Sequence, residues 1–128
     1  MRKKALVVED DPETQRLLSA LLDESGCVVD TASDGAAAIE MLAAGDYDVV
    51  LLDIVLPRVS GTEVMEFLAD SQPETLSKII VVTGLNVEEI RRLFPTVAHT
   101  LGKPVVARRL MQSVALCLSF SDGEFTQR

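Results

Sequence analysis

The sequence predicts an α/β fold of the doubly wound (βα)5 type, with one five-stranded parallel sheet between two layers of helices. Three observations support this prediction. Five aliphatic runs have the length of buried strands, amphipathic segments with helical spacing lie between them, and the two kinds of segment alternate strictly along the 128 residues. Strict alternation favours parallel strands with right-handed crossovers, because each crossover helix must pack back onto the sheet.

The expected strands share the Val, Ile and Leu content of a sheet that is buried on both faces. They are residues 5–8 (ALVV), 27–32 (CVVDTA), 48–53 (DVVLLD), 78–83 (KIIVVT) and 97–101 (VAHTL). Hydrophobic residues make up 48% of the chain, which is enough for one core and leaves little for a second. We therefore expect one domain.

The first helix is expected to begin after Asp11, which is a good N-cap residue and is followed by Pro12 in the first helical turn. Gly26 is expected to end this helix as its C-cap. Four leucines repeat at helical spacing and are interpreted as core residues: Leu17, Leu18, Leu21 and Leu22.

The second and third helices have recognisable ends. The second is expected from Gly35 to Ala44, and Gly45 stops it. The third begins at Ser60, because Glu63 completes a capping box with this residue. Their apolar stripes are expected to face the core and contain Ala38, Met41, Leu42, Val64, Met65, Phe67 and Leu68.

The fourth helix is expected to be short. Asn86 and Glu89 offer it a capped start, and Pro95 interrupts it. The fifth helix is expected from about residue 104 to residue 118. Its apolar stripe is predicted to contain Val106, Leu110, Val114 and Leu118.

The charge and the cysteines restrict the kinds of partner and the location. The formal net charge is -8, with a pI near 4.5, so nucleic acids and anionic membranes would repel the chain. Cys27 and Cys117 have no metal-ligand spacing and are interpreted as buried small hydrophobes in a reducing compartment. The apolar run at residues 5–8 is too short for a signal peptide or a membrane span. We therefore expect a cytoplasmic location, with no direct nucleic-acid or membrane partner.

Polar residues end or directly follow four of the expected strands. They are Glu9 and Asp10 after the first strand, Asp53 at the end of the third, Thr83 at the end of the fourth and Lys103 after the fifth. Because the carboxyl ends of parallel strands meet at one edge of the sheet, we expect these side chains to cluster. Three neighbouring carboxylates repel one another unless a cation lies among them, and Mg²⁺ prefers oxygen ligands. The sequence therefore predicts a Mg²⁺ site at this edge.

A lysine and a threonine complete the predicted cluster. The ammonium group of Lys103 can pair with Asp53 or with an anion bound to it, and Thr83 supplies a hydroxyl donor. A carboxylate can be the nucleophile in phosphoryl transfer when positive charges neutralise the transferred oxygens. Our hypothesis is that Asp53 accepts a phosphoryl group.

These motifs together resemble the receiver domain of bacterial two-component response regulators. The matching stretches are the acidic pair in VVEDDP, the run LLDIVLP with Gly61 after it, the strand end VVTG, and Lys-Pro at 103 and 104. Each motif alone is common by chance, but their order and spacing are specific and cover essentially the whole chain. The resemblance implies a flavodoxin-like fold, a receiver domain over residues 1–120, and a short C-terminal tail, residues 121–128, with no output domain.

The resemblance also implies a role for each site residue. Asp53 would be the phosphoacceptor, and Thr83 and Lys103 would contact the phosphoryl group. Mg²⁺ would be held by Glu9, Asp10, Asp53 and the main-chain carbonyl of Val55. A histidine kinase, a histidine phosphotransfer protein or a small phosphodonor would supply the phosphate, in a two-component pathway or a phosphorelay. The domain would catalyse only its own phosphorylation and dephosphorylation, and would signal to a downstream protein target.

One position departs from the family pattern. Receivers usually carry Tyr or Phe three residues before the lysine, as a rotamer switch, and here that switch position is Thr100. The neighbouring His99 is interpreted as a structural residue, and the arginine pairs at 91–92 and 108–109 as solvated helix faces. The segment from Thr83 to Lys103 is slightly short for the family, which again predicts a trimmed fourth helix. The family's dimer modes use this region, so the oligomeric state stays open. The Lys103–Pro104 bond, often cis in the family, stays open too.

Other functions remain possible from the sequence alone. Thr100 suggests a pseudo-receiver that binds its partner regardless of phosphate. A phosphatase with an aspartyl nucleophile, as in haloacid-dehalogenase-like enzymes, usually has a second Asp two residues after the nucleophile, where this chain has Val55. A flavin-binding protein of the same fold would need a phosphate loop rich in Ser, Thr and Gly, and Glu9 and Asp10 occupy that place.

Overall fold

The computed structural model describes residues 2–121, and its strands form one parallel sheet of order β2-β1-β3-β4-β5. The strands are β1 (Lys3–Val8), β2 (Cys27–Ala32), β3 (Val49–Asp53), β4 (Ile79–Thr83) and β5 (His99–Gly102). The helices are α1 (Pro12–Glu24), α2 (Gly35–Ala44), α3 (Gly61–Ser71), α4 (Val87–Leu93) and α5 (Ala107–Ser121), with a short 3-10 helix, η1 (Pro73–Lys78), that the sequence did not predict. The expected doubly wound, flavodoxin-like (βα)5 fold is confirmed.

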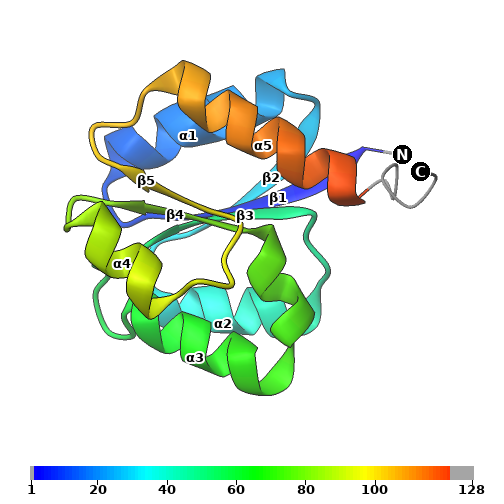
Figure 1. Ribbon diagram of the computed structural model, residues 1–128. Helices are drawn as coiled ribbons and strands as arrows, with labels where there is room; N and C mark the ends of the chain where they lie inside the picture. Colours follow the sequence, from blue (N-terminus) through cyan, green and yellow to red (C-terminus); the bar gives the residue numbers. More distant parts are fainter. Residues whose placement is uncertain (1, 122–128) are drawn as a thin grey trace.

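The helices lie in two layers on opposite faces of the sheet. Figure 1 shows α1 and α5 on one face and α2, α3 and α4 on the other. Because successive strand residues point to opposite faces, Ala5 and Val7 of β1 belong to the core under α1 and α5, whereas Leu6 and Val8 belong to the other core. All strands except the edges are therefore buried on both sides, which explains their continuous aliphatic sequences.

Side-chain caps mark the start of α1, α2, α3 and α4, and those of α1, α3 and α4 were expected from the sequence. Asp11 accepts a hydrogen bond from the main-chain N–H of Thr14, at 2.9 Å, and so starts α1. Ser60 and Glu63 form the predicted capping box of α3. Asn86 caps α4, which is short and ends before Pro95, as predicted. An N-cap of this kind contributes about 1 kcal/mol to stability. Because each cap joins the residue before the helix to its first turn, it also fixes where the preceding loop enters the helix.

Two helices, α1 and α5, differ at their ends from the sequence predictions. The C-cap of α1 is Ser25, and Gly26 follows it with a φ of 89°, so Gly26 lies one position beyond the cap. Helix α5 begins at Ala107, since the residues before it form the loop after β5, and it continues to Ser121 rather than ending at 118. Helix α5 thus includes the first residue of the predicted tail, and residues 122–128 lie outside the described residues.

Two residues expected in the core are exposed. Leu17 is 54% exposed, because the buried face of α1 passes through Leu18 and Leu22 and is too narrow to include it. Val106 is 52% exposed, because it lies before α5 begins and helical spacing does not apply to it. The other predicted stripe residues lie in the two cores or pack against them. Cys27 and Cys117 are free and buried, as predicted.

The strand order determines where the loops open. From β1 the chain passes to β2 on one side and then returns to β3 on the other, so β1 and β3 are neighbours at the point where the order reverses. In open α/β sheets, ligands bind outside the carboxyl ends of the strands at such a point of reversal. Among the helices of residues 2–121, none has both the length and the apolar character needed to cross a bilayer.

Candidate functional site

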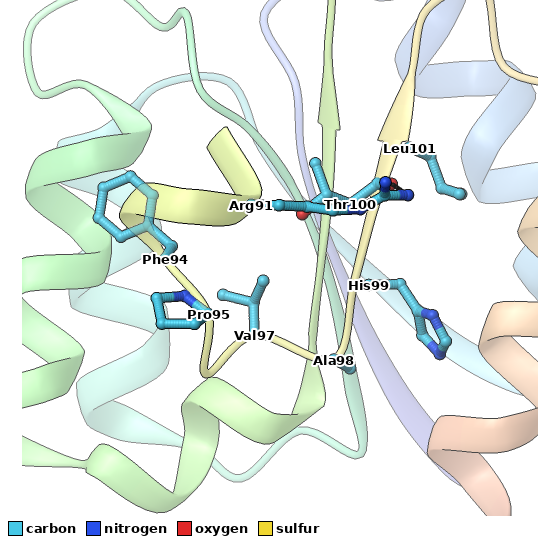
Figure 2. Close-up of a pocket in the computed structure, with 8 residues that line it drawn as sticks. All are labelled: Arg91, Phe94, Pro95, Val97, Ala98, His99, Thr100 and Leu101. Carbon is cyan, nitrogen blue, oxygen red and sulfur yellow. Dashed lines mark hydrogen bonds between the residues drawn. The ribbon is translucent and has the colours of Figure 1, made fainter. Parts of the chain in front are cut away.

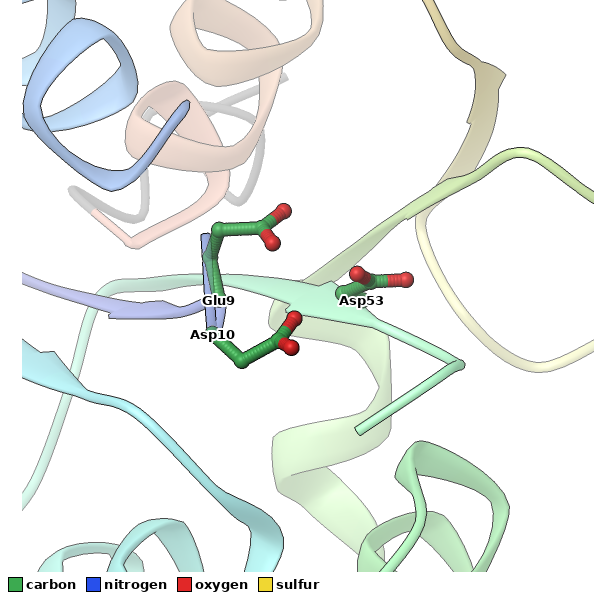
Figure 3. A group of neighbouring side chains, drawn as sticks. All are labelled: Glu9, Asp10 and Asp53. Carbon is green, nitrogen blue, oxygen red and sulfur yellow. The ribbon is translucent and has the colours of Figure 1, made fainter. Parts of the chain in front are cut away.

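Three carboxyl groups meet at the carboxyl ends of β1 and β3. Glu9, Asp10 and Asp53 can each place one carboxylate oxygen so that all three lie within 4.8 Å of one another. Figure 3 shows Glu9 and Asp10 at the end of β1 and Asp53 at the end of β3. Glu9 and Asp53 are buried and Asp10 is exposed, so the cluster is open to solvent on the Asp10 side. The predicted gathering of acids is confirmed.

Lys103 brings one positive charge to this cluster from the loop after β5. Its Nζ donates to Oε1 of Glu9 at 2.9 Å and to Oδ2 of Asp53 at 3.0 Å. The main-chain N–H of Lys103 donates to the carbonyl of Thr83 at 2.8 Å, which fixes this loop against the end of β4. The bond from Lys103 to Pro104 is cis, the isomer that the sequence had left open.

One ammonium group does not neutralise both buried carboxylates. Burial raises the pKa of Glu9, and the negative charge of Asp53 adds to this, although hydrogen bonds from Lys103 and Asp11 oppose it. Burial alone would lower the pKa of Lys103, but its hydrogen bonds to Glu9 and Asp53 outweigh burial and raise that pKa. The edge therefore carries an excess of negative charge, and its ligand atoms are all oxygens. This donor set suits a hard divalent cation.

The other predicted site residues surround Asp53. The main-chain N–H of Val55 donates to Oδ1 of Asp53 at 3.1 Å. Thr83 is fully buried, and its hydroxyl accepts a hydrogen bond from the main-chain N–H of Leu85 at 3.0 Å. Gly61 approaches the main chain of Asp53 so closely that a Cβ there would overlap with it. The structure thus places Thr83 on the strand next to Asp53, while the part of Val55 as a metal ligand stays a prediction.

Thr100, the predicted switch position, lies under α4 and is 3% exposed. Its hydroxyl oxygen has no hydrogen-bond partner within the described part of the chain. It borders a cavity of about 370 Å³ between α4 and β5 that also touches Arg91, Phe94 and Val97. In Figure 2 His99 points to the opposite side of β5, away from Phe94.

Two further side chains, which were not predicted to do so, donate to main-chain carbonyls at the end of β1 and within β5. Gln15 donates from its amide to the carbonyl of Glu9 at 2.8 Å. Arg91, interpreted from the sequence as part of a solvated helix face, pairs with Glu88 and also donates to the carbonyl of Thr100 at 3.4 Å. An amide or a guanidinium on an amphipathic helix gives no sequence signal that separates such contacts from solvation.

The sequence is similar to a known protein family over most of its length. A family model described as the response regulator receiver domain matches residues 5–115. The transcriptional regulatory protein TcrA of Mycobacterium tuberculosis is 37% identical over 101 residues, which cover 79% of this chain and 40% of TcrA. The transcriptional regulatory protein CusR of Escherichia coli is 30% identical over 115 residues, which cover 90% of this chain and 51% of CusR. The chain thus spans about half the length of these relatives.

Solved structures agree with this similarity. The response regulator TrrA of Thermotoga maritima, in complex with Mg²⁺ and BeF, superposes with a TM-score of 0.81 at 31% identity, covering 91% of this chain and 99% of TrrA. A sensor protein from a Polaromonas species has a TM-score of 0.81 at 28% identity, covering 93% of this chain and 98% of its own. With the family match and the acidic cluster at the end of its sheet, this chain belongs to the response regulator receiver domain family, whose members are signalling domains.

Proposed function

We propose that this chain is a phosphorylation-controlled receiver and that Asp53 is its phosphoacceptor. The observation that carries the proposal is the place of Lys103, which lies between Asp53 and Glu9 at the open edge of the sheet. A buried carboxylate held beside an ammonium group and an acidic metal-binding cluster has the surroundings that phosphoryl transfer to a carboxylate needs. The phosphate-independent pseudo-receiver has no support in the described residues or in the comparisons.

The proposed reaction is a transfer of one phosphoryl group. A carboxylate oxygen of Asp53 forms a bond to phosphorus, and the bond from phosphorus to the donor nitrogen of a phosphohistidine breaks, so the donor imidazole is released with a proton from solvent. Lys103 then faces the new negative charge, and the hydroxyl of Thr83 turns from Leu85 to donate to a phosphoryl oxygen. The carboxyl groups of Glu9, Asp10 and Asp53 and the main-chain carbonyl of Val55 would hold the cation. Mg²⁺, when bound, supplies the charge that neutralises the transferred oxygens.

The proposed partners follow from the family and the charge. A histidine kinase, a histidine phosphotransfer protein or a small phosphodonor would supply the phosphate, in the cytoplasm. The relatives are named as transcriptional regulatory proteins, but this chain matches only about half of their length. The net charge of -8 means that the chain as a whole repels the DNA backbone. We therefore propose that residues 1–120 signal through protein contacts, and that any DNA contact of the pathway belongs to another domain or protein.

Phosphorylation by a small donor tests this function directly. The purified chain is incubated with acetyl phosphate or phosphoramidate, with Mg²⁺ or with EDTA, and its intact mass is measured. The proposal expects one added phosphoryl group that requires Mg²⁺, is lost in Asp53→Asn, and is retained in Asp70→Asn, a matched change of an exposed acid on α3. Absence of any adduct with both donors, or an adduct that persists in Asp53→Asn, would overturn the proposal.

A further inference from the structure

Asp10 is held in place only through its main chain. Its side chain is exposed and makes no hydrogen bond or ion pair within residues 2–121. The two peptide groups that flank it are nevertheless both anchored. On its C-terminal side, the main-chain N–H of Asp11 donates to Oε2 of Glu9 at 3.1 Å. The direction of the Asp10 side chain thus depends on what holds these two peptide planes.

The anchor on the N-terminal side of Asp10 is the amide of Gln15. Its Nε2 donates to the carbonyl of Glu9 at 2.8 Å, and that carbonyl belongs to the same planar peptide group as the N–H of Asp10. The same nitrogen lies 3.3 Å from the hydroxyl of Ser33 and 3.5 Å from the carbonyl of Ala32, both after or at the end of β2. Gln15 therefore ties the turn after β1 to α1 and to the neighbouring strand.

The start of α1 sets where this amide points. Asp11 caps the helix, and its carbonyl accepts the main-chain N–H of Gln15 at 2.9 Å, which fixes Gln15 in the first turn of α1 over the ends of β1 and β2. Gln15 is half-buried, and its bond to the Glu9 carbonyl is partly shielded from water, which strengthens it relative to a fully exposed bond. The acidic turn and its anchor are thus built by one continuous segment.

We propose that Gln15 is a positioning residue for the cation site, which holds the Glu9–Asp10 peptide so that the Asp10 carboxylate faces Asp53. The proposal rests on the proposed function, since it needs the acidic cluster to bind Mg²⁺. Residues that orient metal ligands without touching the metal usually change affinity by about tenfold or more when they are replaced. Gln15 would act in this way through the main chain rather than through a ligand side chain.

The test compares two glutamines that make the same kind of bond. Gln15→Met keeps the length of the side chain and removes its donor. Gln72→Met is the matched control, because the Gln72 amide donates to the main-chain carbonyl of Leu42 at 3.2 Å, far from the acidic cluster, and is also half-buried. Mg²⁺ affinity is measured by calorimetric titration, and the melting temperature is measured without Mg²⁺ and over a series of Mg²⁺ concentrations.

The expected result separates positioning from general stability. Gln15→Met should weaken Mg²⁺ binding about tenfold, whereas Gln72→Met should keep the affinity of the parent even where its melting temperature falls equally. Gln15→Asn has a side chain too short for its amide to reach the carbonyl of Glu9, so it should weaken Mg²⁺ binding as Gln15→Met does. It replaces Gln15→Met in the test if Gln15→Met does not fold. Equal Mg²⁺ affinity in Gln15→Asn and the parent would overturn this inference. If the parent chain itself does not bind Mg²⁺, the proposed function fails instead.

Discussion

The ammonium group of Lys103 lies 3.0 Å from Oδ2 of Asp53, although the two residues are far apart in the sequence. The side chain of Lys103 is 29% exposed and that of Asp53 only 5%, so the pair is largely shielded from water. Lys103 also pairs with the buried Glu9. A single cation therefore stabilises two carboxylates that would otherwise repel each other, and it already lies where a phosphoryl group on Asp53 would carry its charge.

Removal of this cation should destabilise the chain when no metal is present. We expect Lys103→Met to lower the free energy of unfolding by about 2 kcal/mol at neutral pH. It leaves two buried carboxylates without a positive charge beside them, and the loss is limited because each keeps a main-chain hydrogen bond and Lys103 is only partly buried. Added Mg²⁺ should recover part of the loss. Urea unfolding followed by circular dichroism measures both effects. Lys78→Met, which replaces a half-exposed lysine in η1, is the control, and its free energy of unfolding should stay within about 0.5 kcal/mol of that of the parent. A similar loss of stability in both variants would contradict the role given to the ion pairs of Lys103.

Two buried threonines should respond with opposite sign to the same replacement. Thr100→Val removes a hydroxyl that has no partner in the described residues, and should raise the free energy of unfolding by about 1 kcal/mol. Thr83→Val removes the acceptor of the Leu85 N–H, and should lower it by about 1 kcal/mol. Urea unfolding of the two variants side by side gives the comparison. Loss of stability in Thr100→Val would show that its hydroxyl has a partner.

A methyl group at Gly61 should disturb the site as well as the fold. A Cβ at this position would overlap with the main chain of Asp53 and Ile54, so Gly61→Ala must shift the end of β3. We expect a loss of about 2 kcal/mol in stability together with weaker Mg²⁺ binding. Gly84→Ala is the control, since a Cβ there meets open space. Chemical denaturation and Mg²⁺ titration should leave Gly84→Ala close to the parent, and an unchanged Gly61→Ala would contradict the close approach.

The pH dependence of stability should reveal the bond from Tyr47 to Asp30. The Tyr47 hydroxyl donates to Oδ2 of Asp30 at 2.8 Å. Burial, this hydrogen bond and the charge of Asp30 raise the pKa of Tyr47 from 10.0 to about 12. The folded chain thus keeps a proton that the unfolded chain loses, so the stabilisation is complete below pH 10 and is lost as the pH rises towards 12.

Tyr47→Phe isolates this contribution. At neutral pH the free energy of unfolding of the variant should be about 1 kcal/mol lower than that of the parent. This difference should vanish towards pH 12. Because the chain has one tyrosine and no tryptophan, phenolate absorbance reports Tyr47 alone. A midpoint near 10 in the folded protein would mean that the hydroxyl is solvated and not bound to Asp30.

The sequence predicts the parts of this structure that depend on position along the chain. Asp53 and Lys103 could be placed together because Asp53 ends one strand of a parallel sheet and Lys103 follows another, and the carboxyl ends of such strands share one edge. The caps at Asp11 and Ser60 could be predicted because each bonds to a residue only three positions away. Local rules and topology were sufficient for these features.

Features that depend on packing across elements were not predictable. The periodic pattern of leucines does not distinguish Leu17 from Leu18, because the width of the buried face depends on α5 and the sheet. Within residues 2–121 the hydroxyl of Thr100 has no partner, and this depends on where the short α4 places Arg91 and Phe94. The contact of Gln15 with the carbonyl of Glu9 joins a helix to a strand end and has no sequence signature.

The most direct test of the central claim is to locate the phosphoryl group on the chain. Borohydride reduces an aspartyl phosphate to homoserine, and mass spectrometry of the resulting peptides identifies the residue that carried it. After treatment with acetyl phosphate and Mg²⁺, the account predicts homoserine at position 53 and nowhere else in the chain. Homoserine at another acidic residue, such as Asp10, or a phosphorylated chain that yields none, would contradict it.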